Sequence, residues 1–424
     1  MPTKDYEFKY GHGSVKFAVP SGKILGEVKI KEAPVIQDVE KAVLDAVRNP
    51  IDSPALKDIV KPGQKIVFIV NDPTRVANSH VFMPLLLKEV NDAGVKDGDI
   101  SIIFALGAHR QMTQQEMTEE VGEDVAKRIT MINADCHDQS QFKYFGETSR
   151  GTPVWFHNIV AAADHVIATG SVVHHFFAGF GGGRKAVFPG VSFYETIRKN
   201  HSMIFDPNAV IGKLAGNPIY EDQMEGVKMQ PPSFLINVVL NEEKEFLKVF
   251  AGDYVKAHLE ACKFVDEVYG APIEKEADLV IATCGGYPKD INVYQLQKTM
   301  DNAWCAVRQG GVVIILGECV EGSGSATYEK LMRENDTPEK VEATVKADFQ
   351  IGAHKAYAVT RLMKKAEFIL VSALDESMAK TLLFTPAPSV EAAIEMAYKK
   401  LGADPSIILM PQGSLTVPIV KAGG

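Results

Sequence analysis

Cysteine, tryptophan and long apolar runs are all scarce in this chain, and each scarcity excludes a class of protein. The 424 residues include five cysteines and two tryptophans, and the cysteines never form a CxxC pair. This argues against a disulfide framework or a zinc knuckle and favours a reducing compartment. No stretch approaches the ~18 apolar residues that a membrane-spanning helix needs. The first residues, MPTKDYEFKYGHG, also lack an apolar signal segment. These absences predict a cytoplasmic protein with no membrane partner.

An excess of basic residues is missing as well. The formal net charge is −9, with 45 Lys and Arg against 54 Asp and Glu. Because contacts to phosphate backbones need a basic surface, this balance argues against a nucleic-acid partner. The chain is 46% hydrophobic and 23% charged, which is ordinary for a globular protein. Its length predicts two domains. An anionic small molecule would need cations placed locally, so Arg and Lys within motifs gain weight.

Short apolar runs rich in Val and Ile recur along the chain, separated by stretches with helical patterning. Because they do not alternate with polar residues, they predict strands buried on both faces. Strand–helix alternation predicts an α/β fold with largely parallel sheets. The boundary fits best near residues 270–276, which gives an N-terminal α/β domain over 1–270 and a C-terminal α/β domain over 271–424. The predicted strands are 66–70, 102–106, 165–169, 279–283, 312–316, 368–372 and 407–410.

Ionisable and glycine-rich segments follow four of these strands. They are Asn71–Arg75, Gly107–Arg110, Gly170–His175 and Cys284–Pro288. Open α/β sheets bind ligands at the carboxyl ends of their strands. The pattern therefore predicts an enzyme with one composite site.

The segment His174–Gly190, HHFFAGFGGGRKAVFPG, is the most informative stretch. It is not a Walker A loop, because no Gly-Lys-[Ser/Thr] follows at the required spacing, and it fails GxGxxG because position 184 is Arg. A structural glycine-rich turn is one interpretation. The other is a site that binds an anionic cofactor near Lys185 and moves protons through a histidine. If the backbone is extended here, His174 and His175 point to opposite faces, so one of them enters the site more easily.

Other candidates are weaker when read from the residues alone. His109 is a second histidine that follows a strand, and a solvated loop side chain is its alternative. His201 is either a helix-end histidine or a single metal ligand, since no local zinc motif is present. Tyr294 and Lys298 share one face of a predicted helix, which could simply be solvated. Arg75 can grip a carboxylate with two hydrogen bonds.

Taken together, these segments resemble the lactate racemase family, whose members use the nickel-pincer nucleotide cofactor. The resemblance covers nearly the whole chain, and its pieces occur in the family's order. They are Asp72–Arg75, Gly107–Arg110, His175–Lys185, Pro189–Gly190, Asn200–His201, Gly285–Pro288, Tyr294–Gln295 and Lys298.

The resemblance implies two Rossmann-like α/β domains with the active site between them, and a role for each matching residue. Lys185 would carry the cofactor covalently, and His201 would be the protein ligand to nickel. The nucleotide would be held by Asp72, Pro73, Thr74 and Arg75. The paired acid and base would be His109 and His175, and the substrate would contact Arg75, Tyr294, Gln295 and Lys298.

The implied reaction is racemisation or epimerisation of a 2-hydroxy acid at C2, by reversible hydride transfer through a 2-keto acid. Cofactor-biosynthesis enzymes would be needed for loading. His174, His354 and residues 318–325 depart from the pattern of lactate-specific members, so the resemblance leaves open which 2-hydroxy acid is the substrate. Two alternatives are a nicotinamide-type 2-hydroxy acid dehydrogenase, for which no fingerprint is well placed, and a non-catalytic carrier of the pincer nucleotide.

Overall fold

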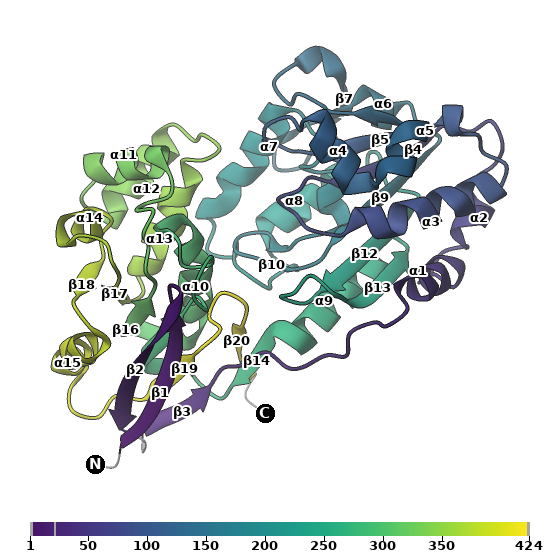
Figure 1. Cartoon of the computed structure of the whole chain (residues 1–424). Helices are drawn as coiled ribbons and strands as arrows, with labels where there is room; N and C mark the ends of the chain where they lie inside the picture. Colours follow the sequence, from purple (N-terminus) through teal and green to yellow (C-terminus); the bar gives the residue numbers. More distant parts are fainter. Residues whose placement is uncertain (1–2, 21–22, 422–424) are drawn as a thin grey trace. The chain divides into compact units, whose positions relative to one another are not determined.

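The computed structural model describes residues 3–20 and 23–421. The chain forms two compact units, each built around a six-stranded sheet (Figure 1). The central unit runs over Ala33–Val265, and the terminal unit combines the described residues up to Glu32 with those from Asp266 onward.

The sheet of the central unit has the strand order β13-β12-β9-β4-β5-β6. All neighbours are parallel except β12 and β13. Along β4, Ile66, Phe68 and Val70 enter one apolar cluster while Val67 and Ile69 enter another, so the strand is buried on both faces as predicted. The bounds are β4 Ile66–Asn71, β5 Ile100–Ala105, β6 Thr130–Ile132, β9 His165–Ser171, β12 Phe234–Leu240 and β13 Phe246–Gly252.

Helices cover both faces of this sheet. One cluster contains side chains of α1, α3, α4 and α5, and the other contains side chains of α6, α8 and α9. The helices are α1 Val39–Arg48, α2 Leu56–Ile59, α3 Ser79–Asp92, α4 Gln114–Val121, α5 Glu123–Arg128, α6 Asn158–Ala161, α7 Tyr194–His201, α8 Pro218–Val227 and α9 Lys256–Tyr269. Short strand pairs are β7 Phe142–Glu147 with β8 Pro153–His157, and β10 His174–His175 with β11 Gly179–Phe180.

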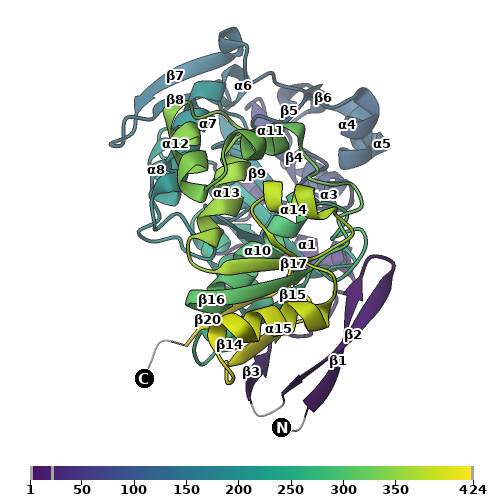
Figure 2. The ribbon, with the colours of Figure 1, turned by 90° about the vertical axis from the view of Figure 1, so that its left-hand side faces the viewer.

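The terminal unit has an all-parallel sheet of order β18-β17-β16-β15-β19-β3. Its strands are β3 Ile24–Glu27, β15 Ala277–Thr283, β16 Val307–Leu316, β17 Glu367–Val371, β18 Thr385–Ala387 and β19 Ile407–Met410. Its helices are α10 Val293–Ala306, α11 Ala326–Glu334, α12 Pro338–Ala347, α13 His354–Met363, α14 Glu376–Thr381 and α15 Val390–Leu401. A hairpin of β1 Thr3–Tyr10 and β2 Gly13–Pro20, and a pair of β14 Gly270–Ile273 and β20 Val417–Val420, complete the unit (Figure 2).

The predicted α/β class and all seven predicted strands are confirmed, but the observed units differ from the expected division at residues 1–270 and 271–424. The start of the chain belongs with the C-terminal half. Phe8 and Phe17 of the β1–β2 hairpin share an apolar cluster with Leu279 of β15, and β3 pairs with β19. Strand pairing between residues so far apart in the sequence leaves no local signal in the chain.

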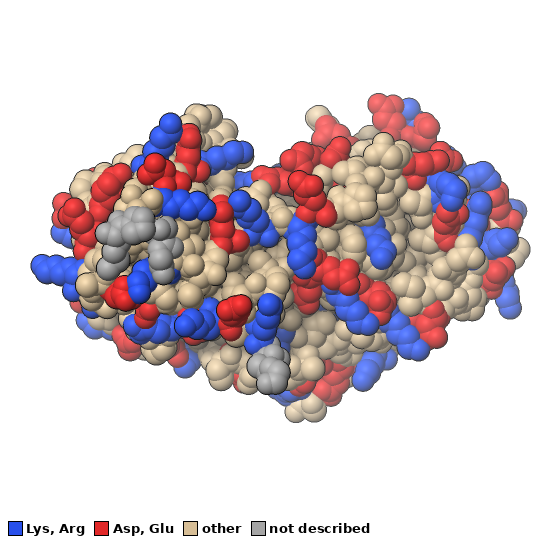
Figure 3. Space-filling view, turned by 90° about the horizontal axis from the view of Figure 1, so that it is seen from below, with Lys and Arg blue, Asp and Glu red and all other residues tan. Residues whose placement is uncertain are grey.

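Within the described residues, none of the helices has the length and apolar character to cross a membrane. On the face of the molecule in Figure 3, acidic and basic side chains are interspersed over the surface. That face shows no continuous stripe of one sign.

Candidate active site

Four of the predicted site residues follow three neighbouring strands of the central unit. The order β9-β4-β5 places the loops after these strands side by side at one edge of the sheet. Asp72 and Arg75 follow β4, His109 follows β5, and His175 follows β9. The carboxyl ends of parallel strands thus meet where the sequence predicts a composite site.

Asp72 and His109 form a close pair. The His109 Nδ1 atom lies 2.7 Å from Asp72 Oδ2, and the Thr74 backbone N–H donates to Asp72 Oδ1 at 2.7 Å. Burial by itself would raise the pKa of Asp72, but the hydrogen bonds from His109 and Thr74 outweigh it and lower that pKa. The ionised carboxylate therefore accepts Nδ1–H and leaves the lone pair of His109 Nε2 available to take a proton.

Glu120 lies close enough to add its charge to this pair, and sequence reasoning missed it. The buried Ser79 hydroxyl donates to Glu120 Oε1 at 2.8 Å. Burial, with a smaller contribution from the charge of Asp72, raises the pKa of Glu120 to about 7. Glu120 sits on α4, where the helical pattern alone marks it as a solvated residue, so no local signal identifies it.

Replacing Glu120 by glutamine is expected to remove a pH dependence of stability. Glu120 holds its proton in the folded chain up to about pH 7, against about 4.5 for an unperturbed glutamate. The wild-type protein therefore loses stability as the pH rises through this window, and Glu120→Gln does not. The free energy of unfolding of the variant minus that of wild type should increase from near zero at pH 4 to roughly 1–3 kcal/mol at pH 8. Urea unfolding at several pH values measures this. The exposed neighbour Glu119→Gln is the control, and parallel curves for wild type and Glu120→Gln would contradict the assignment.

His175 lies in the two-residue strand β10, and its ring is held by aromatic neighbours. The ring stacks on Phe176 with centroids 5.1 Å apart and meets the edge of Phe177 at 4.5 Å, while His174 instead contacts Phe180 at 4.9 Å. The Ala178 backbone N–H donates to His175 Nδ1 at 3.3 Å. Burial, followed by the positive charges of Lys185 and Arg75, lowers the pKa of His175 well below its usual value. His175 is therefore neutral and carries its proton on Nε2.

The glycine run after His175 is packed against its own unit rather than open to a ligand. A Cβ on Gly179 would lie 2.2 Å from the Lys213 carbonyl oxygen, and one on Gly183 would lie 2.4 Å from the His258 ring. Both glycines, like Gly182, have positive φ values. These glycines allow the loop to pack tightly around Lys185.

Lys185 lies directly after this run, in the short 3-10 turn Gly183–Ala186. Its Nζ atom is 5.9 Å from the centroid of the Phe177 ring. Burial first, then the charges of Arg184 and Arg75, lower the pKa of Lys185 well below its usual value. A lowered pKa favours the neutral, nucleophilic form of the amine, which fits a residue that bonds covalently to a cofactor.

His201 is the last residue of α7, and the edge of the Phe177 ring lies 5.0 Å from it. Phe177 thus neighbours both Lys185 and His201. At the start of this helix Phe193 is the N-cap, and the Ser192 hydroxyl donates to the Val187 carbonyl. Among the described residues, no group of three or more His, Cys, Asp and Glu could hold a metal ion. An imidazole here can only complete a ligand set that another group supplies.

The remaining predicted residues lie in the terminal unit. Tyr294, Gln295 and Lys298 belong to the first turns of α10, and Tyr294 and Lys298 are both exposed, so they share a face as predicted. The Nζ atom of the buried Lys355 lies 3.9 Å from the centre of the Tyr294 ring, and Lys355 donates to Gln297. Lys355 was not among the predicted site residues, because nothing in the sequence places α13 against α10.

The fold and the site define the class first: a two-unit α/β enzyme with a pair of histidines at strand ends beside a buried lysine. Residues 10–212 match the lactate racemase N-terminal domain, and residues 273–418 match the lactate racemase C-terminal domain. Lactate racemase of Thermoanaerobacterium thermosaccharolyticum is 32% identical over 416 residues, which is 96% of this chain and 97% of the relative. Lactate racemase of Lactiplantibacillus plantarum is 32% identical over 381 residues, covering 88% and 89% respectively. The chain therefore belongs to the lactate racemase family.

Solved structures agree with this assignment. The lactate racemase apoprotein from T. thermosaccharolyticum superposes with a TM-score of 0.88 at 30% identity, over 98% of this chain and all of that one. A protein from Thermotoga maritima, at 17% identity and a TM-score of 0.65, shares the fold over 93% of this chain. The resemblance stated from sequence, the fold class and the enzyme class, an isomerase, are thus confirmed.

Proposed function

We propose that this enzyme interconverts the stereoisomers of a 2-hydroxy acid, lactate or a related acid, at C2. The observation that carries the proposal is the pairing of Asp72 with His109 at the same strand-end edge as the neutral His175. Exchange of a hydroxyl proton needs one imidazole that can accept a proton and a second imidazole that presents an N–H to the substrate.

The residues fit the nickel-pincer nucleotide that the family resemblance implies. Lys185 offers an amine whose neutral form is favoured for covalent attachment, and His201 offers one imidazole to a metal whose other ligands come from the cofactor. Pro73, Thr74 and Arg75 are exposed and can contact the nucleotide. Asp72 is turned inward onto His109, so we propose that it acts by orienting that ring rather than by contacting the cofactor. When bound, the cofactor would accept and return a hydride at C2 of the substrate.

The two histidines have distinct starting roles. His109 Nε2 accepts the proton of the substrate hydroxyl, and the resulting positive charge is stabilised by Asp72. His175 presents Nε2–H, which can hydrogen-bond to an oxygen on the substrate. To act as a proton donor, His175 must first be protonated at Nδ1, which breaks the long 3.3 Å contact from the Ala178 N–H; it then gives up one proton and returns to the neutral ring. The substrate carboxylate would be held by Arg75, Gln295 and Lys298, with Tyr294 beside it.

A direct assay tests the reaction. The protein is produced together with cofactor-biosynthesis enzymes, its nickel content is measured, and single enantiomers of lactate, malate and a sugar acid are supplied. We expect one acid to reach a mixture of stereoisomers without net accumulation of keto acid. Accumulation of keto acid with added nicotinamide would instead indicate a dehydrogenase. A fully loaded protein that changes none of the acids would contradict the proposal.

The cellular compartment that we propose for the enzyme is inferred from its cysteine thiols. None of the five cysteines, all of which lie in the described residues, forms a disulfide, and four of them are buried. This supports the cytoplasmic location expected from the sequence.

A further inference from the structure

Arg184, the residue before the proposed attachment lysine, is fully buried. Its Nη1 donates to the Phe180 carbonyl at 3.1 Å and its Nη2 to the Ala178 carbonyl at 2.7 Å. Its guanidinium lies 4.7 Å from the centre of the Tyr220 ring. Burial lowers the pKa of Arg184 to about 10, so it is still charged at neutral pH. A buried charge held by carbonyls and a ring is costly, and it calls for a function.

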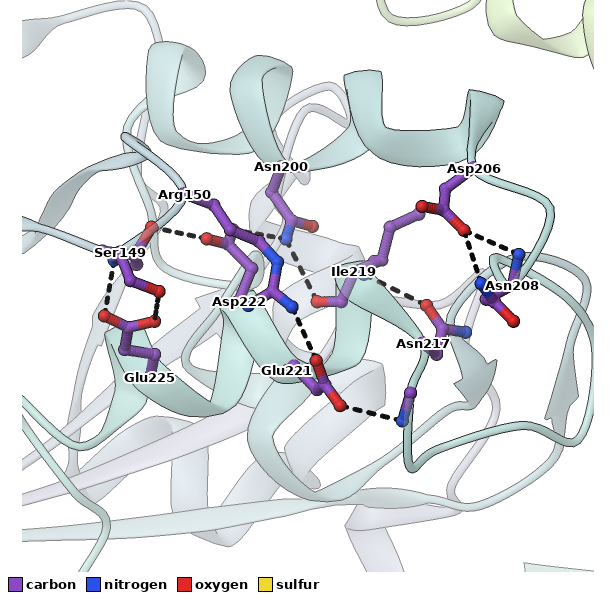
Figure 4. A network of polar contacts seen from close by, with 12 residues as sticks. Ser149, Arg150, Asn200, Asp206, Asn208, Asn217, Ile219, Glu221, Asp222 and Glu225 are labelled. Carbon is purple, nitrogen blue, oxygen red and sulfur yellow. Dashed lines mark hydrogen bonds and ion pairs between the residues drawn. The ribbon is translucent and has the colours of Figure 1, made fainter.

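A directed chain of hydrogen bonds leads away from Arg184. Its Nε donates to Gln223 Oε1 at 3.1 Å, Gln223 Nε2 donates to Asn200 Oδ1 at 3.0 Å, and Asn200 Nδ2 donates to Asp222 Oδ2 at 2.8 Å. All four side chains are fully buried. The Asn200 amide points toward Asp222 and also donates to the Ile219 carbonyl at 3.1 Å (Figure 4). Both amides are aligned between a cation and an anion, an arrangement in which each bond strengthens the next.

The other end of the chain is anchored as firmly. Asp222 also accepts from the hydroxyls of Thr148, at 2.5 Å, and Thr152, at 3.0 Å. The network therefore joins four segments: the loop of Lys185, the end of α7, the middle of α8 and the turn between β7 and β8. Two of its members precede a proposed functional residue, since Arg184 precedes Lys185 and Asn200 precedes His201.

We propose that the Arg184–Gln223–Asn200–Asp222 chain is a positioning device for the attachment lysine. It ties the Lys185 loop to the helix that ends at His201, and it fixes a buried positive charge on the residue next to Lys185, which favours the nucleophilic form of that amine. The proposal concerns the protein before cofactor loading, so it can be tested whether or not the racemase assignment holds.

The charges around Lys185 support this electrostatic role. Arg184 and Arg75 both disfavour a charged Lys185 amine, and this amine in turn acts on His175 and His258. Both of these imidazoles have lowered pKa values, chiefly through burial, and are neutral. No carboxylate appears among the groups that act on Lys185. Arg184 is thus the largest charge effect on the amine, after burial itself.

The test measures the reactivity of Lys185 in the cofactor-free full-length protein. Trace acetic anhydride acetylates only neutral amines, and peptide mass spectrometry follows Lys185 acetylation across pH 5–11. Gln223→Glu places a carboxylate against the guanidinium and compensates its charge. We expect the midpoint pH of labelling to rise by about one unit or more in this variant. Arg184→Met should raise it as well, whereas Arg184→Lys, which keeps the charge, should leave it near the wild-type value.

Gln230→Glu is the matched control, since the Gln230 side chain donates to the Val160 carbonyl of the same unit and takes no part in the Arg184 network. Its labelling midpoint should equal that of wild type. Near-ultraviolet circular dichroism confirms that each variant is folded. If Arg184→Met does not fold, the folded Gln223→Glu protein decides the matter. An unchanged Lys185 midpoint in folded Gln223→Glu would overturn the proposal.

Discussion

Alanine at either His109 or His175 is expected to reduce kcat by ~10²–10⁴-fold in both reaction directions, the usual contribution of a general acid or base. The two losses should be comparable, because racemisation uses both faces of the substrate and neither histidine can replace the other. His109 is held by Asp72 at 2.7 Å and His175 by its aromatic neighbours. Neither is proposed to anchor the cofactor, so nickel content and the mass of the loaded protein should be nearly unchanged.

His174→Ala is the matched control for this prediction. His174 lies next to His175 in the same short strand, but its ring contacts Phe180 instead of Phe177. Chiral chromatography of the product gives the rate in each direction for all three variants. Full activity in His175→Ala together with an inactive His174→Ala would show that the wrong histidine of the pair was assigned.

The strands and the residues at their ends could be predicted because their signals are local. Ile66–Val70 is an unbroken apolar run, and the charged residues after it have no role in a buried strand. Sequence alone therefore placed Asp72 and His109 in loops at one sheet edge.

The groups that support these residues could not be predicted, because they meet only through tertiary packing. Gln223 and Asp222 read as ordinary polar residues of an amphipathic helix, yet both are fully buried. The glycine run suggested an approach to a ligand, but whether a glycine faces a ligand or a neighbouring loop depends on the fold. The N-terminal segment packs against and pairs with the C-terminal half, and no residue near it in the sequence indicates these contacts.

Lys185→Ala is expected to abolish covalent attachment of the cofactor. Attachment needs a neutral amine, and burial followed by the charges of Arg184 and Arg75 lowers the pKa of Lys185 and so favours that form. Lys185 lies close to Phe177, whose ring also contacts His201, so the attached group would lie near the proposed nickel ligand. Intact-protein mass spectrometry of protein made with the biosynthesis enzymes should show an adduct on wild type and none on Lys185→Ala.

Two further variants make this prediction specific. Lys199→Ala removes an amine from α7 near His201 in sequence and should keep the full adduct. His201→Ala should keep the organic adduct but lose nickel, because its imidazole is proposed to bind the metal and not the organic part. An adduct of unchanged mass on Lys185→Ala would show that another nucleophile holds the cofactor. Equal nickel content in wild type and His201→Ala would show that the metal ligand lies elsewhere, even if the attachment lysine is correct.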